Sequence, residues 1–429
     1  MLKKLERLLF GNNQNIKYYA LNGILFTMVT VLSKGYAIKF LDRLGGDDIH
    51  YSLFNALPGF IAIFTTIPGI LMIQRGESKR KTLGIFFYIS RFMPLLLAAV
   101  PFLDKEIQPI VFVLIYGLMN FPESISATSL QDYTGDIFLP HERADALSVR
   151  NQMSQISQVT ISILVGFILS LSSVNRTVII MYQVFIVLSF LIGLKEINYM
   201  YKLDPIEKDD IRIRRKVPKL KRSLKGIFSH REYVGFLACS LLFHFGWQMG
   251  WPLFNSYQIK YLGANEMWLT IINVLSSLFM VLSFPVWKKI IKKRDYKFTI
   301  ALATFGMGIT PILYILSGNL VILTLMQPVT GFFTAGTTVA ILGSLLAVSP
   351  EEYRTMSVAV HATLTSVTLA TAPLIGTYIQ EIFNIQGALF ATAVLRLLGS
   401  GVFLYRFLIS INKVPALKFE KKKKVIRKK

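Results

Sequence analysis

Apolar runs of about twenty residues recur along the whole chain, and they constrain its fold more than any other feature. A helix of about 20 residues crosses the roughly 30 Å hydrocarbon core of a bilayer. Charged residues make up only 17% of the sequence, against roughly 25% in a soluble domain. The runs are continuous rather than alternating, which favours helices over barrel strands. The sequence therefore predicts an all-α, polytopic membrane protein.

Twelve such runs are expected to form transmembrane helices. They begin near Tyr18, Tyr51, Thr82, Pro109, Leu147, Thr177, Tyr233, Glu266, Thr299, Asn319, Met356 and Ile385. The expected organisation is a cytoplasmic N-terminal segment (1–17), a six-helix bundle (18–198), a basic linker (199–232), a second six-helix bundle (233–410) and a basic tail (411–429).

The distribution of charge predicts how the helices are oriented. Most Lys and Arg residues lie in the tails and in the even-numbered loops, as in "QRGESKRK" and "KKIIKKRDYK", whereas odd-numbered loops are acid-balanced or nearly uncharged. The positive-inside rule then places both termini and the central linker in the cytoplasm. An even number of helices agrees with that placement. We expect a multi-pass protein of the cytoplasmic membrane.

The net charge of +23 has two interpretations, nucleic-acid binding and retention beside anionic lipid headgroups. Each cation near an anionic leaflet contributes about 1 kcal/mol. No soluble basic module with interleaved aromatic residues is present, so membrane lipids are the expected partner and nucleic acid is not. The segment Val217–Tyr233 has an apolar face and a basic face, which is typical of a helix lying on the membrane surface.

Two related short sequence segments occur, one in each half of the chain. "LPHERADALSV" and "SPEEYRTMSV" each contain a Pro followed by Glu and Arg and end in Ser-Val, and Pro140 and Pro350 are 210 positions apart. Gly166 and Gly376 have the same separation. Such agreement with the helix count indicates a duplicated bundle. Parallel repeats of this kind are typical of transporters whose substrate site lies between the halves.

The chain resembles the major facilitator superfamily over essentially its whole length. The resemblance is carried by "TGFFTAGTTVAILGSLLAVSPEEYRTMSVAV", by "LPHERADALSVRNQM" and by the turn "RGESKRKTLG". It implies a cavity lined by helices 1, 4, 7 and 10 that opens alternately to each side. Arg80 and Lys81 match the closing basic pair of the family's motif after helix 2, but its Asp is missing. The Gly-Pro element of drug antiporters in helix 5 is also absent.

Ionisable residues within the expected spans point to functional positions, because each costs roughly 2.5–3.5 kcal/mol to insert. They are Lys34, Arg91, Glu123, Arg150, His244, His361 and Arg396. Glu123 is the first candidate for proton coupling, because a carboxylate in a low-dielectric cavity titrates closer to neutral pH. His244 is the second. The alternative for Glu123 is a static ion pair with Arg91 or Lys34. Pro122 is expected to open the helix locally.

A stripe on helix 7 is the strongest candidate for solute binding. His244, Gln248, Trp251 and Asn255 share one helical face and combine a ring with hydrogen-bonding groups. The alternative is an aromatic anchor at the membrane interface. The full set of expected solute-binding residues is Lys34, Asn120, His244, Gln248, Trp251, Asn255 and Gln327. A second stripe on helix 5 (Asn151, Gln155, Gln158 and Ser162) fits a cavity or interhelical hydrogen bonds equally well.

Four basic residues at the expected cytoplasmic helix ends are predicted to act in gating: Arg80, Lys81, Arg143 and Arg354. Arg143 and Arg354 are flanked by glutamates, so ion pairs formed in one access state and released in the other would bias the conformational equilibrium.

The expected function is secondary active transport of a small solute by alternating access, with proton coupling. A polar or anionic metabolite suits Lys34 and the hydrogen-bonding stripes. The alternatives are export of amphipathic or drug-like compounds, and a non-transporting receptor or scaffold on the same fold. An enzyme is not expected, since the five His are scattered and no P-loop occurs. With a single cysteine, Cys239, we expect no metal or other cofactor, and the monomer is expected to function alone.

Overall fold

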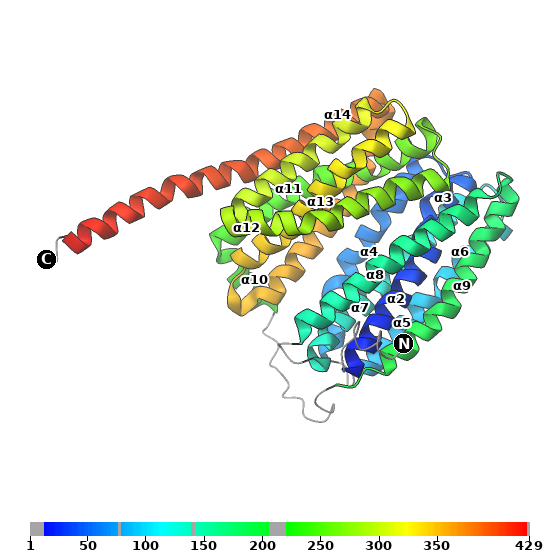
Figure 1. Cartoon of the computed structure of the whole chain (residues 1–429), viewed down its shortest axis with the longest axis horizontal. Coiled ribbons are helices and arrows are strands. Elements are labelled where there is room, and N and C mark those ends of the chain that lie inside the picture. Colours follow the sequence, from blue (N-terminus) through cyan, green and yellow to red (C-terminus); the bar gives the residue numbers. More distant parts are fainter. Residues whose placement is uncertain (1–12, 76–78, 139–141, 206–219, 427–429) are drawn as a thin grey trace, which may run out of the picture. The chain divides into compact units, whose positions relative to one another are not determined.

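The computed structural model describes residues 13–75, 79–138, 142–205 and 220–426, and these fold into helices joined by short turns (Figure 1). They form two compact units. Unit 1 comprises Met1–Val217 together with Gln258–Val274 and Leu369–Leu374. Unit 2 comprises Pro218–Tyr257, Leu275–Thr368 and Ile375–Lys429.

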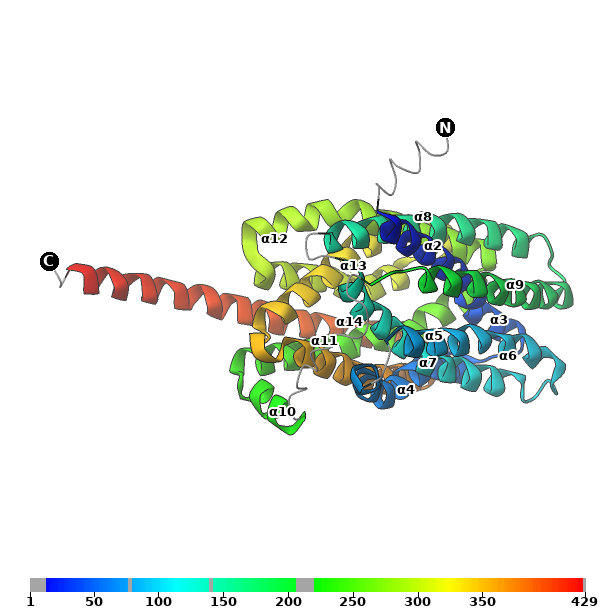
Figure 2. The same ribbon diagram turned by 90° about the horizontal axis from the view of Figure 1, so that it is seen from below.

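The helices of unit 1 form a continuous series of neighbours. Their bounds are α2 (Gln14–Lys34), α3 (Ala37–Arg43), α4 (Asp48–Arg75), α5 (Lys79–Phe92), α6 (Pro94–Ala99), η1 (Val100–Phe102), α7 (Gln108–Ile137), α8 (Arg143–Ser170) and α9 (Asn175–Tyr201). Helix α2 lies between α8 and α9, α9 contacts α5, and α7 lies between α5 and α4 (Figures 1 and 2). Every long helix of unit 1 thus has at least one long neighbour on which to bury a face.

Unit 2 contains the remaining helices. They are α10 (Leu220–Ser229), α11 (Arg231–Ser256), α12 (Glu266–Leu316), α13 (Leu320–Val348), η3 (Glu351–Tyr353) and α14 (Arg354–Ile426), and a π-helical turn η2 (Tyr257–Tyr261) follows α11. Residues 258–261 of η2, the first residues of α12 and Leu369–Leu374 of α14 belong to unit 1.

Helices α12 and α14 each contain a sharp break. Asp295 has φ 77° and Asn384 has φ 66°, and both interrupt the helical backbone. Asp and Asn tolerate this left-handed φ better than most side chains. Each also accepts a backbone N–H at the start of the next helix, from Phe298 and from Gly387 respectively. The breaks lie close to Thr299 and Ile385, where the sequence predicts new spans.

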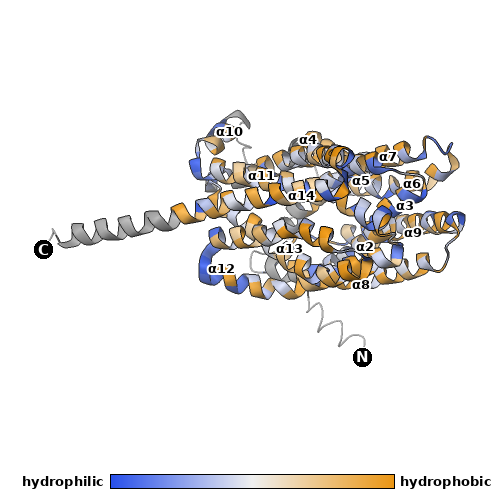
Figure 3. Cartoon of the chain, turned by 90° about the horizontal axis from the view of Figure 1, so that it is seen from above, coloured by the Kyte–Doolittle hydropathy of each residue, from blue (hydrophilic) through white to orange (hydrophobic). Residues whose placement is uncertain are grey.

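The hydropathy of the helices fits a membrane protein. Eight helices among the described residues are long and apolar enough to cross a bilayer, and two of these are the broken helices α12 and α14. Apolar residues follow the helices, whereas hydrophilic residues gather at several turns, including the bend of α12 (Figure 3). The all-α membrane fold expected from the sequence is confirmed, while the count of twelve spans stays a prediction.

The core of unit 2 is built around helix α11. Phe243 is fully buried there, and Cys239 is 5% exposed. Helix α10 packs Ile227 and Leu224 into the same cluster, so the apolar face expected to rest on the membrane surface is used at least partly inside the protein. That the segment Val217–Tyr233 lies on the membrane surface stays a prediction.

A fully buried ion pair joins two helices of unit 1. Arg91 on α5 donates from Nε to Glu196 Oε2 on α9 at 2.7 Å and from a terminal nitrogen to Oε1 at 2.9 Å. The two side chains are 3% and 0% exposed. The guanidinium also lies against the rings of Phe26 and Phe87. Two parallel bonds of this geometry fix the relative position of the helices that carry them.

Breaking this pair from one side is expected to destabilise unit 1 strongly. Arg91→Met leaves Glu196 as an unpaired buried charge, which costs roughly 3–5 kcal/mol. The double variant Arg91→Met/Glu196→Leu removes both charges and should be more stable than Arg91→Met alone. Thermal unfolding of the detergent-purified proteins measures the difference. A double variant less stable than the single one would contradict this account of the pair.

Candidate functional site

A second ion pair within unit 1 joins the candidate proton carrier to helix α2. Lys34 ends α2, and its Nζ contacts Glu123 Oε2 on α7. Both side chains keep some exposure, 17% for Lys34 and 23% for Glu123. The Lys34 ammonium also lies 5.4 Å from the centre of the Tyr116 ring. This is the ion pair that the sequence analysis raised as the alternative for Glu123, with Lys34 rather than Arg91 as the partner.

Helix α7 runs without interruption past Pro122 to Ile137, so the expected local opening of the helix beside Glu123 is wrong. Two polar side chains near Glu123 on this helix donate hydrogen bonds to backbone carbonyl oxygens. Asn120 donates from Nδ2 to the carbonyl oxygen of Pro58 on α4 at 2.9 Å, and Ser126 donates to the carbonyl oxygen of Glu123 at 2.9 Å. Asn120 therefore joins two helices in this state.

The polar stripe on α11 is divided by its environment. Gln248 is 6% exposed and joins α14, since its Oε1 accepts from the Thr368 hydroxyl at 2.6 Å and its Nε2 donates to the Thr365 carbonyl at 3.3 Å. His244, Trp251 and Asn255 are only half-buried. The stripe therefore has a fixed part, Gln248, which is bonded to α14. It also has an accessible part, which consists of the half-buried His244, Trp251 and Asn255.

His244 belongs to a small polar cluster with His361 in unit 2. The His244 Nδ1 lies 2.8 Å from the carbonyl oxygen of Ser240, one turn earlier. The Ser240 hydroxyl lies 2.8 Å from His361 Nε2 on α14. The two imidazole rings are 5.5 Å apart between centroids. A neutral His244 that donates from Nδ1 to this carbonyl presents Nε2 as a free acceptor.

Three of the five remaining predicted site residues have side chains that the structure describes. Gln327 on α13 is 3% exposed and donates to the Leu323 carbonyl of its own helix. Arg80 donates to the Tyr201 carbonyl and lies over the ring of that residue, whereas Lys81 is exposed at the start of α5. Arg143 and Arg354 begin α8 and α14, but their side chains lie outside the described part of the chain.

Sequence reasoning missed a polar network at the start of α12, within unit 1. Glu266 is 1% exposed and accepts from Arg43 on α3 through two bonds, at 2.6 and 3.0 Å. The Tyr182 hydroxyl donates to the same carboxylate at 3.1 Å. Tyr36 adds a bond to the Thr270 hydroxyl at 2.6 Å. Arg43 and Glu266 flank expected loops, so their sequence signal is that of ordinary loop charges.

The structure also assigns a role to Arg396, which is fully buried on α14. It donates to the carbonyl oxygens of Gly246 at 3.0 Å, Trp247 at 2.8 Å and Met307 at 3.2 Å. The Met307 carbonyl lacks its usual helical donor because residue 311, four positions later, is a proline. Arg396 therefore satisfies backbone groups of α11 and α12 rather than binding a carboxylate.

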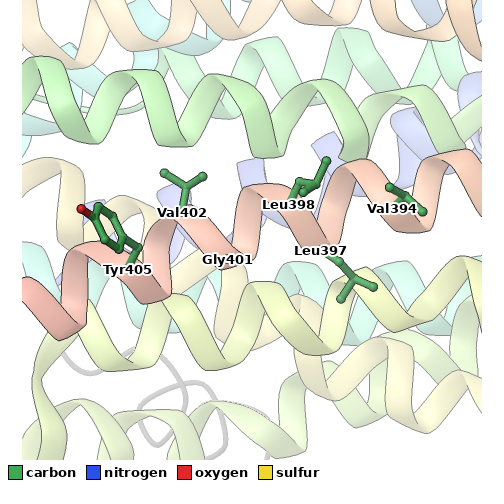
Figure 4. Close-up of a pocket in the computed structure, with 6 residues that line it drawn as sticks. All are labelled: Val394, Leu397, Leu398, Gly401, Val402 and Tyr405. Carbon is green, nitrogen blue, oxygen red and sulfur yellow. The ribbon is translucent and has the colours of Figure 1, made fainter.

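Two further features of the described residues, their capacity to bind a metal and a groove on α14, add no candidate site. The described residues contain no group of three His, Cys, Asp or Glu side chains positioned to hold a metal ion. An open groove of about 470 Å³ runs along α14, and its lining residues all come from that helix (Figure 4). It is lined by Val394, Leu397, Leu398, Gly401, Val402 and Tyr405. Its only side-chain polar group is the Tyr405 hydroxyl, so it does not suit a polar solute.

Comparison with known proteins decides the family. The family model described as Major Facilitator Superfamily matches residues 18–327 and 239–429. The chain belongs to the major facilitator superfamily. The resemblance seen in the sequence is thereby confirmed, and superfamily membership indicates a transporter rather than an enzyme. No curated protein matches the sequence significantly.

Solved structures of superfamily transporters have a similar fold. The nucleoside transporter NupG is 13% identical with a TM-score of 0.67, and the match covers 92% of this chain and 99% of NupG. The inward-open xylose transporter XylE from E. coli is 14% identical with a TM-score of 0.65, covering 91% and 94%. A POT family transporter in complex with a thioalcohol-conjugated peptide is 11% identical with a TM-score of 0.69, covering 92% and 96%. At these identities the likeness shows the fold alone.

Removing the Arg396 side chain is expected to destabilise unit 2. Arg396→Met loses three charge-assisted bonds to backbone carbonyls and leaves the Met307 oxygen unsatisfied, which we expect to cost roughly 3 kcal/mol or more. Arg406→Met on the same helix is the matched control, because the Arg406–Glu232 pair is exposed and worth less than about 1 kcal/mol. Thermal unfolding compares the two variants. Equal losses would show that the carbonyl contacts of Arg396 contribute nothing special.

Proposed function

We propose that this protein is a proton-coupled secondary transporter that moves a small polar solute together with protons. The observation that carries the proposal is the partly exposed Lys34–Glu123 pair. The Arg91–Glu196 pair is sealed and doubly bonded, whereas the Lys34–Glu123 pair has one contact and retains exposure on both side chains. A proton can reach the partly exposed Glu123 carboxylate without local unfolding.

Protonation of Glu123 changes the balance of charge at the end of α2. A neutral Glu123 no longer attracts the ammonium of Lys34, and an unpaired cation within a membrane span is unfavourable. The state that lets Lys34 reach water or a solute group is then favoured. A proton binding at Glu123 thus shifts the conformational population by its differential affinity for the two states.

The accessible part of the α11 stripe supplies groups for a polar solute. His244 offers an acceptor nitrogen, Asn255 an amide that both donates and accepts, and Trp251 a ring face for packing. Gln248, fixed by Thr365 and Thr368, holds the middle of the stripe in register with α14. This combination orients a small molecule through hydrogen bonds and packs against its apolar part.

Replacing Glu123 should abolish coupling without abolishing exchange. Full-length protein in liposomes that contain a pH-sensitive dye is tested with a panel of sugars, nucleosides, amino acids and carboxylates. Solutes that the wild type carries should drive proton entry, and Glu123→Gln should reduce that entry at least about tenfold while solute exchange at equal pH persists.

Glu106→Gln is the control for this experiment, because Glu106 is an exposed acid in the turn before α7. It should leave both proton entry and exchange unchanged. Proton entry at the wild-type rate in Glu123→Gln would exclude Glu123 as the carrier. Exchange that is absent from the wild type for every solute class would favour a non-transporting role.

A further inference from the structure

Arg150 differs from three other cations in the helices of unit 1. Lys34, Arg91 and Arg43 each contact a glutamate. Among the side chains that the structure describes, no carboxylate pairs with Arg150. Since the candidate span of α8 begins at Val149, Arg150 lies at the end of that span, and its uncompensated charge requires another explanation.

The surroundings of Arg150 hold it in place without neutralising it. It lies on α8 against α2, where its guanidinium is 4.8 Å from the centre of the Tyr19 ring. A terminal nitrogen donates to Asn22 Oδ1 over a long 3.4 Å. Gly23 makes this approach possible, because a Cβ there would lie 2.6 Å from Arg150 Cγ.

Two buried polar atoms at this position lack hydrogen-bond partners. They are Arg150 Nε and the hydroxyl oxygen of Ser154, one turn further along α8. Buried polar atoms are almost always satisfied by protein, water or a ligand. Both atoms are shielded from solvent beside Gly23 of α2, so they can donate to an acceptor that enters when this part of α8 becomes open.

The adjoining face of α8 is suited to contact with water. Asn151, Gln155 and Gln158 are exposed, and none of them makes an interhelical hydrogen bond among the described residues. Exposed amides in a membrane span are unfavourable against lipid, so we expect this face to border an aqueous path. A solute in that path would come within reach of Arg150.

We propose that Arg150, with Asn22 and Ser154, forms a subsite for the anionic group of the transported solute, a carboxylate or a phosphate. The inference rests on the proposed function and narrows its substrate to an anion. The planar guanidinium can donate two parallel bonds in its own plane to such a group, while it lies over the Tyr19 ring. Lys34, neutralised by Glu123 until a proton binds, is not needed for this recognition.

The test is thermal unfolding of the detergent-purified full chain with matched pairs of compounds. The pairs are glucose 6-phosphate and glucose, uridine monophosphate and uridine, and succinate and succinamide. We expect an anionic member to stabilise the wild type more than its neutral partner. Arg150→Gln should weaken the fitted affinity for that anion at least about tenfold. Arg176→Gln, which alters an exposed arginine on α9, should not.

A second variant keeps the test decisive if Arg150→Gln does not fold. Asn22→Asp retains the arginine but places a carboxylate beside its guanidinium, where it competes with any incoming anion. We expect Asn22→Asp to lose the preference for the anionic member of each pair, as Arg150→Gln does. Retention of that preference in a folded Asn22→Asp protein would overturn the proposal.

The remaining outcomes separate the anion site from its alternatives. Equal responses of wild type and Arg150→Gln to all pairs, including no response at all, overturn the subsite. Arg150-dependent stabilisation by phosphatidylglycerol alone assigns the site to a lipid headgroup and overturns the solute assignment. Neutral members that bind as well as anions leave proton-coupled transport standing without the subsite. Arg150-dependent anion binding without proton-driven flux supports the subsite but overturns proton-coupled transport.

Discussion

The cost of placing charge in a low-dielectric interior is the constraint on which unit 1 depends. Each glutamate that compensates a cation there joins segments far apart in the sequence: Glu196 holds α9 to α5, Glu123 holds α7 to α2, and Glu266 holds the start of α12 to α3. These pairs differ in burial, from sealed to partly exposed. The sealed pair fixes the scaffold, whereas the partly exposed pair is the one for which we propose proton coupling.

In unit 2, backbone carbonyl oxygens rather than carboxylates compensate the buried charge of Arg396. Arg396 is fully buried, yet its partners are carbonyl oxygens on α11 and α12. The proline four residues after Met307 leaves one of those oxygens without its helical donor, and the guanidinium satisfies it. A proline inside a helix and a buried cation, each unfavourable alone, are compatible when they occur together.

Much of the fold follows from one-dimensional patterns, because the length and hydropathy of membrane spans are local properties. The breaks at Asp295 and Asn384 lie close to the starts expected at Thr299 and Ile385. Pairings are different, because they depend on how helices pack. Glu196 follows Lys195 near the end of an apolar run and has the pattern of a loop charge, although it is fully buried. Because pairings depend on helix packing, the sequence did not indicate the Arg43–Glu266 contact. For the same reason it left both Arg91 and Lys34 as possible partners of Glu123.

The position of Cys239 has a practical consequence for chemistry on this protein. The only thiol in the chain is 5% exposed and belongs to the cluster around Phe243. A thiol-reactive dye should therefore label the folded protein slowly and react as the core of unit 2 opens. Cysteines introduced at exposed positions can in turn be labelled selectively without removing the native one. The native Cys239 can therefore report the unfolding of unit 2, because it lies in the buried cluster around Phe243.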